Sequence, residues 1–331
     1  FFSGLNVPLI ISLPEKWKRL ASPDFKVGGS SDRRVGFIDF APTLLSIAGQ
    51  KPPPHLQGHA FLGKHQAPPQ EYSYGFRGRM DERYDMVRSV IGKRFIYIRN
   101  YMPHKIYGQH VGYMFVTTTT QVWKRLFDEG KLNEAQSYFW KTKPPEELYD
   151  LEKDPDEVYN LAKSKAHTEI LKRMRLAHLN HLMKIIDVGF LPEGEIHERS
   201  EGTTPYVMAR TERYPFRRIM LAADMASGLS PWATKTLIGY LNDKDSAVRY
   251  WGAMGLLMRG KQGVKGAGKK LEKALKDNSP YVRVIAAEAL GKYGSKEQIE
   301  SAVKTLGKTA DPTKNGCFPS MLAMNAIDHL D

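Results

Sequence analysis

The sequence predicts an α+β fold in its first part and an all-α arrangement of helical repeats in its last part. Three observations carry this prediction. The apolar run VPLIISL precedes a helical pattern, two alternating segments flank Gly92-Lys93, and residues 248–260 align with residues 282–294 at a spacing of 34. The first pattern is typical of a buried strand in an α/β layer, the second of a β-hairpin, and the third of a helical repeat.

Composition excludes several classes of protein. The chain has 331 residues, of which 41% are hydrophobic, so two or three packed domains are expected and disorder is not. No apolar run approaches the roughly 18–20 residues that span a bilayer, and the single cysteine excludes an internal disulfide. The formal net charge of +13 favours polyanionic partners. Nucleic acid is not expected among them, because no helix-turn-helix, zinc-finger or ribonucleoprotein signature is present.

The first 50 residues predict a strand, a loop and a helix. Asn6–Leu13 is the strand, and Gly28 to Ser31 interrupt the loop that follows. Asp39 is placed to cap a helix whose first turn contains proline, and Gly49 is placed to end it. The expected buried side of this helix consists of Leu44, Leu45 and Ile47.

The middle of the chain predicts a small antiparallel sheet beside helices. Residues 51–70 form a connector rich in proline and glycine, after which residues 86–89 and 94–101 are expected to pair as strands. A helix is predicted at residues 123–139, a further strand at 147–151 and a long helix at 168–186. His178 lies on the apolar stripe of the long helix and is interpreted as a core residue.

Four ordered segments resemble one family. These are FFSGLNVPLIISLPEKW at the start, VGFIDFAPTLLSIAG at 35–49, RMDERYDMVRSVIGKRFIYIRNY at 79–101 and ELYDLEKDPDEVYNLA at 147–162. Over roughly residues 1–190 they resemble the C-terminal part of a sulfatase of the alkaline-phosphatase-like superfamily. The resemblance implies that residues 1–55 end an α/β catalytic domain and that residues 56–190 form the antiparallel subdomain that follows it.

The resemblance also implies where the chemistry lies. Sulfatases hydrolyse sulfate esters with a formylglycine made from Cys or Ser in a Cys/Ser-x-Pro-x-Arg motif and with calcium held by acidic residues, and those motifs precede the Val-Pro strand. We therefore expect a C-terminal fragment without a catalytic residue, a metal ligand or activity of its own. Cys317, in CFPSM, only superficially echoes the motif, because Met321 stands where the arginine belongs, and it is interpreted as a small packed thiol.

Six residues are candidates for contact with substrate. The resemblance implies that the antiparallel subdomain lines one wall of the substrate cleft, and arginine suits recognition of oxyanions. The alternative is a solvated loop with internal ion pairs and a histidine in a turn. The candidates are Arg77, Arg79, Asp81, Glu82, Arg88 and His104.

Residues 206–331 resemble HEAT repeats, and residues 191–205 are interpreted as the linker that precedes them. In two copies, LNDKDSA before VRYWGAMGLLMRG and LKDNSPY before VRVIAAEALGKYG, a valine-arginine pair opens an apolar helix. An irregular helical bundle is the alternative. The repeats are expected to bind an acidic protein or an anionic polymer and to contribute nothing to bond cleavage.

The predicted function is that of a sulfuric ester hydrolase acting on a sulfated polysaccharide or another sulfate ester, as the full-length parent of this chain. Two alternatives stay open: a non-catalytic interaction module or pseudoenzyme defined by the repeats, and a phosphodiesterase of the same superfamily. The chain itself does not indicate a compartment, whereas the resemblance implies a periplasmic, extracellular or lysosomal location.

Overall fold

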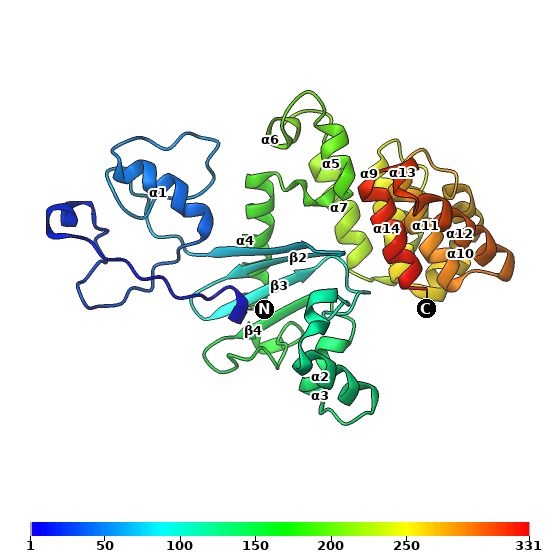
Figure 1. The fold of residues 1–331 in the computed structure, drawn as a ribbon, viewed down its shortest axis with the longest axis horizontal. Helices are drawn as coiled ribbons and strands as arrows, with labels where there is room; N and C mark the ends of the chain where they lie inside the picture. Colours follow the sequence, from blue (N-terminus) through cyan, green and yellow to red (C-terminus); the bar gives the residue numbers. More distant parts are fainter. Residues whose placement is uncertain (1, 331) are drawn as a thin grey trace. The chain divides into compact units, whose positions relative to one another are not determined.

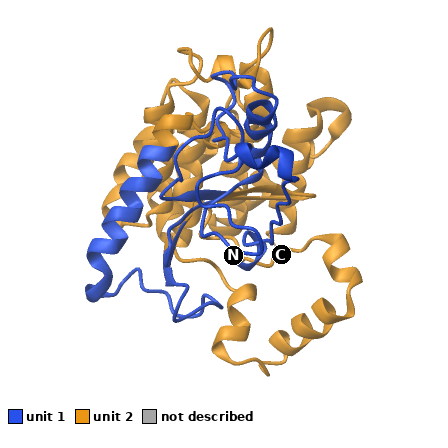
Figure 2. Cartoon of the chain, turned by 90° about the vertical axis from the view of Figure 1, so that its left-hand side faces the viewer, with its two compact units in different colours: residues 1–75, 88–98, 147–181 blue, residues 76–87, 99–146, 182–331 orange. Residues whose placement is uncertain are grey.

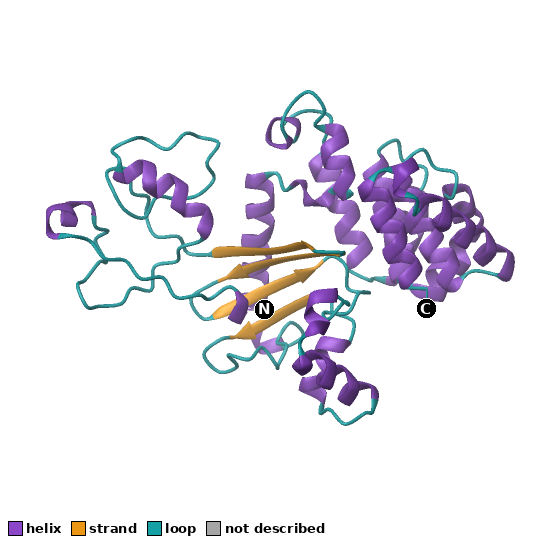
Figure 3. Ribbon diagram, viewed as in Figure 1, coloured by secondary structure: helices purple, strands orange, loops and turns teal. Residues whose placement is uncertain are grey.

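The computed structural model describes residues 2–330, which form an α+β fold followed by helical repeats (Figure 1). Their contacts define two compact units, coloured in Figure 2. The first unit contains residues 1–75, 88–98 and 147–181, and the second contains residues 76–87, 99–146 and 182–331. Figure 3 shows that the strands gather in one sheet and that helices make up most of the remaining regular structure.

The sheet has four antiparallel strands in the order β1-β2-β3-β4. They are β1 (Ser73–Met80), β2 (Arg83–Ile91), β3 (Phe95–Asn100) and β4 (Glu146–Asp150). The predicted hairpin is confirmed, and Gly92 closes its turn by donating its amide hydrogen to the Phe95 carbonyl oxygen at 2.8 Å. Strand β1 was not predicted, although Tyr74, Phe76 and Met80 alternate along it; all three of these side chains are exposed.

The sulfatase-like closing segment forms local hydrogen bonds in the first unit. The Asn160 side-chain oxygen accepts from the amides of Leu148, at 3.1 Å, and Ala162, at 2.9 Å. The Asp154 carboxylate accepts from the amides of Val158 and Tyr159 at 3.0 and 2.7 Å. These bonds satisfy backbone donors that the turns leave without partners, so the segment performs a structural role around β4.

The core of the first unit joins the sheet to α4 (Thr168–Ile185), as the helical pattern predicted. Leu171 and Met174 on this helix pack with residues from three strands, Val90, Tyr97 and Leu148. His178 is 6% exposed and lies with its ring centroid 5.8 Å from that of Tyr97. Its interpretation as a packed core residue is therefore confirmed.

The predicted strand and the predicted buried face of the helix in the first 50 residues are both wrong. Residues 6–13 form no strand, since they pair with no strand among the described residues, and Ile10 is 92% exposed. Helix α1 (Phe40–Ile47) exists, but it exposes 68% of Leu44 and 38% of Ile47 and buries Pro42, Thr43 and Ser46 instead. Apolar periodicity identified the helix correctly, but it did not identify which face has a partner.

The polar face of α1 holds a loop. The Asp39 carboxylate accepts from the amides of Gly36, at 2.8 Å, and His59, at 2.6 Å, and so does not cap the helix as predicted. Ser46 accepts from the amide of His65 at 2.8 Å. Gly63 has φ +90°, and a Cβ there would lie 2.3 Å from the Ser46 backbone carbon, so only glycine fits this close approach. Gly49, with φ +78°, ends the helix as predicted.

The predicted helix at 123–139 is two helices in the second unit. Helix α2 (Thr118–Asp128) ends before Gly130, whose φ of +66° interrupts helical geometry, and α3 (Glu134–Ser137) begins at the cap residue Asn133. Trp123 stacks on Phe139 with ring centroids 4.7 Å apart. Aromatic packing therefore joins α2 to the segment after α3, which the apolar pattern had predicted to be one continuous helix.

The repeats of the second unit consist of paired helices, as predicted. Equivalent apolar positions in α9 and α11 are fully buried: Val248, Ala253 and Leu256 correspond to Val282, Ala287 and Leu290, all 0% exposed. The helices are α7 (Phe216–Ser227), α8 (Thr234–Tyr240), α9 (Ser246–Met258), α10 (Gly260–Ala274), α11 (Pro280–Tyr293), α12 (Lys296–Thr309), α13 (Pro312–Asn315) and α14 (Cys317–Asp328).

One continuous core fills the second unit. It contains Met86 and Tyr101 from the strand region together with the buried residues of the repeats. The Trp251 indole, 1% exposed, donates to the Phe190 carbonyl oxygen at 2.8 Å and also lies beside the Tyr101 ring. The repeats consequently share their core with the end of the sheet, and they are not a separable appendage.

Residues 191–205, interpreted from sequence as a linker, contain α5 (Glu193–Arg199), and α6 (Pro205–Met208) follows. Glu195 in α5 is only 3% exposed, so this segment is packed although its composition is polar. Short 3-10 helices complete the described structure: Phe2–Gly4, Glu15–Leu20, Phe37–Asp39, Gly112–Val116, Tyr138–Trp140, Lys165–His167, Val188–Phe190 and Pro231–Ala233. Within residues 2–330, no helix combines the length and apolarity required to cross a membrane.

Candidate functional site

The predicted substrate-binding residues do not form one cluster. Arg77 and Arg79 lie on β1, Asp81 and Glu82 form the β1–β2 turn, and His104 follows β3, all in the second unit. Arg88 lies on the part of β2 that belongs to the first unit. Five of the six candidates thus belong to the second unit, and Arg88 belongs to the first.

Arg79 is bound by the helical part of its own unit. Its Nε lies 2.9 and 2.6 Å from the two carboxylate oxygens of Glu193, at the start of α5. Its Nη1 donates to the Met321 sulfur on α14 at 3.2 Å and to the Asp81 carbonyl oxygen at 3.3 Å. These partners occupy most of the guanidinium, which therefore links the hairpin to α5 and α14.

The turn of the hairpin is held in the same way. The Asn325 side chain on α14 donates to the Glu82 carbonyl oxygen at 2.7 Å and accepts from Arg83 at 2.8 Å. Arg83 also pairs with Asp328 at 2.6 Å. Hydrogen bonds from the backbone amides of Glu82 itself and of Gly112 lower the pKa of the Glu82 carboxyl. Asp81, with φ 45°, is exposed at the tip of the turn.

His104 is enclosed. Both ring nitrogens are buried and have no hydrogen-bond partner within residues 2–330. Burial lowers the pKa of His104 well below its usual value, and the charges of Lys105, His329, Lys143 and Lys292 lower it further. The imidazole is therefore neutral in the folded protein, and the residue as a whole is half-buried.

A buried ion pair lies in the same unit. Lys143 Nζ is 2.9 Å from Asp85 Oδ2, and both side chains are 1% exposed. The ammonium also donates to the Lys105 carbonyl oxygen at 2.8 Å, while burial lowers the pKa of Lys143. Such a pair needs all of its partners, because either charge alone would be buried without compensation.

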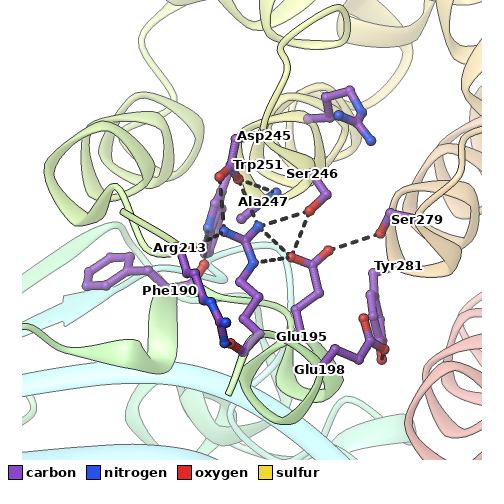
Figure 4. Close-up of polar contacts among 12 residues, drawn as sticks. Phe190, Glu195, Glu198, Arg213, Asp245, Ser246, Ala247, Trp251, Ser279 and Tyr281 are labelled. Atoms are coloured by element: carbon purple, nitrogen blue, oxygen red, sulfur yellow. Dashed lines mark hydrogen bonds and ion pairs between the residues drawn. The ribbon is translucent and has the colours of Figure 1, made fainter. Parts of the chain in front are cut away.

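Glu195 joins α5 to two successive repeats, as Figure 4 shows. Its carboxylate accepts from Ser246 at 2.8 Å, at the start of α9, and from Ser279 at 3.1 Å, at the cap of α11. Arg199 completes the cluster by binding both Glu195, at 2.7 Å, and Asp245, at 3.0 Å. Each charged side chain of this cluster has a partner, and the Glu195 carboxylate lies at the N-termini of α9 and α11, where a negative charge is favourable. We therefore interpret the cluster as structural.

The described residues offer no metal centre: between residues 2 and 330 no group of three or more His, Cys, Asp or Glu side chains is arranged to hold an ion. Cys317 is exposed and forms no disulfide. It is the first residue of α14, and Met321 stands at the position where a nucleophile motif would require an arginine.

Comparison with known proteins identifies both halves of the chain. An ulvan-active sulfatase from Formosa agariphila is 40% identical over 195 residues, which cover 59% of this chain and 31% of that protein. Part of the chain is therefore similar to sulfatases. A second ulvan-active sulfatase from the same organism is 29% identical over 182 residues, or 52% of this chain and 32% of that protein. The sulfatase-related chain thus spans about a third of the length of these relatives.

The repeats are identified independently, since a family model described as HEAT repeats matches residues 234–315. Among solved structures, a putative sulfatase from Bacteroides thetaiotaomicron is similar at 22% identity and a TM-score of 0.28, covering 44% of this chain and 24% of that chain. The predicted combination of a sulfatase-related part and HEAT repeats is confirmed by the sequence comparisons.

Sequence reasoning missed Arg83, Glu193 and Glu195, which fix the hairpin and α5. The segment FRGRMDERYD was considered for its arginines, but a single sequence does not reveal which of them pairs internally. The acidic partner of Arg79 is 114 positions away, and the amide partner of Arg83 is 242 positions away. Only the fold brings residues at such separations together.

Proposed function

We propose that the protein to which this chain belongs hydrolyses sulfate esters of a sulfated polysaccharide. The observation that carries the proposal is the 40% identity, over 195 residues, to a protein named an ulvan-active sulfatase. The net charge of +13 supports it, because a cationic protein attracts a polyanionic substrate.

In this proposal the chain supplies substrate positioning, and the nucleophile and metal ligands lie outside it. Arg79 and Glu82 hold the β1–β2 hairpin through internal contacts, and Asp81 is the one exposed residue among the six candidates. Contact between substrate and Arg77, Arg88 or His104 stays a prediction. Calcium and formylglycine, implied by the family resemblance, belong to the proposal in the same way, and no residue of this chain is assigned to either.

The test is sulfate release by the full-length protein. With ulvan and with a small aryl sulfate as substrates, we expect turnover of at least one of the two, and we expect none from residues 1–331 alone. A full-length protein that cleaves a phosphodiester but no sulfate ester would support the superfamily alternative. Absence of turnover on both classes, with binding of ulvan retained, would support the non-catalytic alternative.

A further inference from the structure

A polar groove lies on the HEAT repeats, between the ends of α10 and α11 and the length of α12. Its volume is about 810 Å³. Four cationic side chains line it, Lys276, Arg283, Lys304 and Lys308, together with hydroxyl and amide groups of Ser301, Thr305 and Asn315. No aromatic residue is among its described lining residues, so the groove lacks the stacking surfaces with which proteins bind single-stranded nucleic acid.

The arginine of this groove departs from the pattern of the preceding repeat. Arg249 and Arg283 are equivalent, and the Nη1 atom of each donates to two carbonyl oxygens of the turn before its helix, at 2.9 and 3.1 Å and at 2.8 and 3.1 Å. In Arg249 the remaining edge, Nε and Nη2, forms a bidentate pair with Asp277, both distances being 2.7 Å. In Arg283 that edge has no carboxylate partner within residues 2–330.

The expected carboxylate is present in the sequence but is used elsewhere. Asp311 lies 34 residues after Asp277 and so occupies the equivalent position. It accepts from the amide and the hydroxyl of Thr313, at 3.0 and 2.6 Å, and pairs with Lys314 at 2.9 Å, so it caps α13. The repeat therefore keeps an arginine fixed for bidentate binding while its internal acceptor is engaged at another site.

The charges around Arg283 are uneven. Lys276, Lys304 and Lys308 are exposed, and none has an ion-pair partner in the described part of the chain. The two acidic lining residues are engaged, since Glu272 accepts from Gln298 and Glu297 accepts from Ser295 at 2.7 Å. The groove thus combines a pre-oriented guanidinium edge with three exposed lysines, which together suit an oxyanion on a polymer.

We propose that this groove binds a sulfated polysaccharide, with one sulfate group on the Nε–Nη2 edge of Arg283 and adjacent sulfates near Lys304 and Lys308. The inference rests on the proposed function, because the ligand is the polymer that the enzyme would cleave. It goes further in assigning a binding site on the HEAT repeats that would hold the polymer and raise its local concentration.

The test is the affinity of residues 1–331 for ulvan and dextran sulfate, with uncharged dextran as the negative probe, measured by titration calorimetry at several salt concentrations. Arg283→Gln should weaken binding of both sulfated polymers about tenfold, which corresponds to the loss of one charge-assisted bidentate contact. Lys304→Ala/Lys308→Ala should weaken it about three- to tenfold and make it less dependent on salt.

The matched control is Lys265→Ala/Lys269→Ala, which removes two exposed lysines with the same four-residue spacing from α10, outside the groove. It should change affinity less than about twofold if the groove, and not overall charge, decides binding. Arg283→Lys separates bidentate hydrogen bonding from charge attraction, because lysine keeps the positive charge but lacks the planar guanidinium. This variant should bind the sulfated polymers nearly as weakly as Arg283→Gln does. Thermal unfolding of each variant shows that the repeats are intact.

Equal losses in the groove and control variants would overturn the proposal, as would unchanged affinity in Lys304→Ala/Lys308→Ala. Equal affinity for polygalacturonate, a carboxylated polymer, would reject a sulfate site in favour of a general polyanion surface. Failure of the proposed function would give a different result. If the full-length protein has no sulfatase activity but Arg283→Gln still weakens polymer binding by residues 1–331, the proposed function is rejected and the groove proposal is retained. If the full-length protein cleaves ulvan but substitution of Arg283 leaves polymer affinity unchanged, the groove proposal is rejected and the proposed function is retained.

Discussion

The amino-terminal segment and the HEAT repeats use similar apolar residues with opposite results. In the segment of residues 5–47, Ile10 and Leu44 are 92% and 68% exposed, whereas Val282 and Leu290 in α11 are fully buried. Both regions contain helices, and in both the apolar residues recur at helical spacing. The difference teaches that apolar periodicity reports which side chains are available for burial. Burial itself depends on a facing surface, which the repeats obtain from one another.

The largest contrast is between an exposed ion pair of the amino-terminal segment and a buried ion pair of the second unit. Replacing Lys143 with Met should destabilise the folded chain by about 3–5 kcal/mol, because it leaves Asp85 buried without its partner. Replacing Lys18 with Met removes an exposed pair with Glu15 in the amino-terminal segment and should cost less than about 1 kcal/mol. Urea unfolding of both variants measures the difference. Similar losses would show that Asp85 gains water or a proton when Lys143 is removed.

A second contrast uses the same substitution in both regions. Leu290→Ala should cost about 2–5 kcal/mol, because it opens a cavity in the core that the repeats share with Met86 and Tyr101. Leu44→Ala, on the exposed face of α1, should change stability by no more than about 0.5 kcal/mol. Amide hydrogen exchange should report the same order, with slower exchange in α11 than in α1. A large effect of Leu44→Ala would mean that the exposed face of α1 is covered in solution.

The smallest contrast is the pH dependence contributed by one histidine. Burial, aided by nearby positive charges, depresses the pKa of His104 in the folded state, so the unfolded chain binds a proton more readily. Its contribution to stability is complete above the pKa of unfolded histidine, about 6.5, and is lost as pH falls below that value, at no more than about 1.4 kcal/mol per pH unit.

The measurement is the urea midpoint of the wild-type chain and of His104→Gln at pH 7.5 and pH 5.5. The variant should lose less stability on acidification than the wild type does. His55→Gln, which removes an exposed imidazole from the amino-terminal region, is the control for the substitution itself. Parallel pH dependence in the wild type and His104→Gln would contradict a neutral, buried His104.

Local patterns predicted a substantial part of the fold. The hairpin around Gly92, the strand at 146–150 and the helix at 168–185 were predicted within a few residues, because their apolar periodicity and turn chemistry act over short distances. The repeats were predicted from a 34-residue recurrence that includes Val248 and Val282. The candidate site was predicted less well: the sequence indicated the hairpin arginines, but the contacts that bind Arg79 to Glu193 join residues 114 positions apart.

What the sequence by itself determined about this chain is its periodicity, its excess of positive charge and the motifs that relate it to sulfatases and HEAT repeats. The tertiary contacts account for the rest: α5 is packed and not a free linker, α14 holds the hairpin through Asn325, and within residues 2–330 Arg283 has no carboxylate partner like that of Arg249. The physical reason is that periodicity depends on neighbours along the chain. Burial and charge pairing depend on groups brought together across hundreds of residues, and no local pattern records which of them meet.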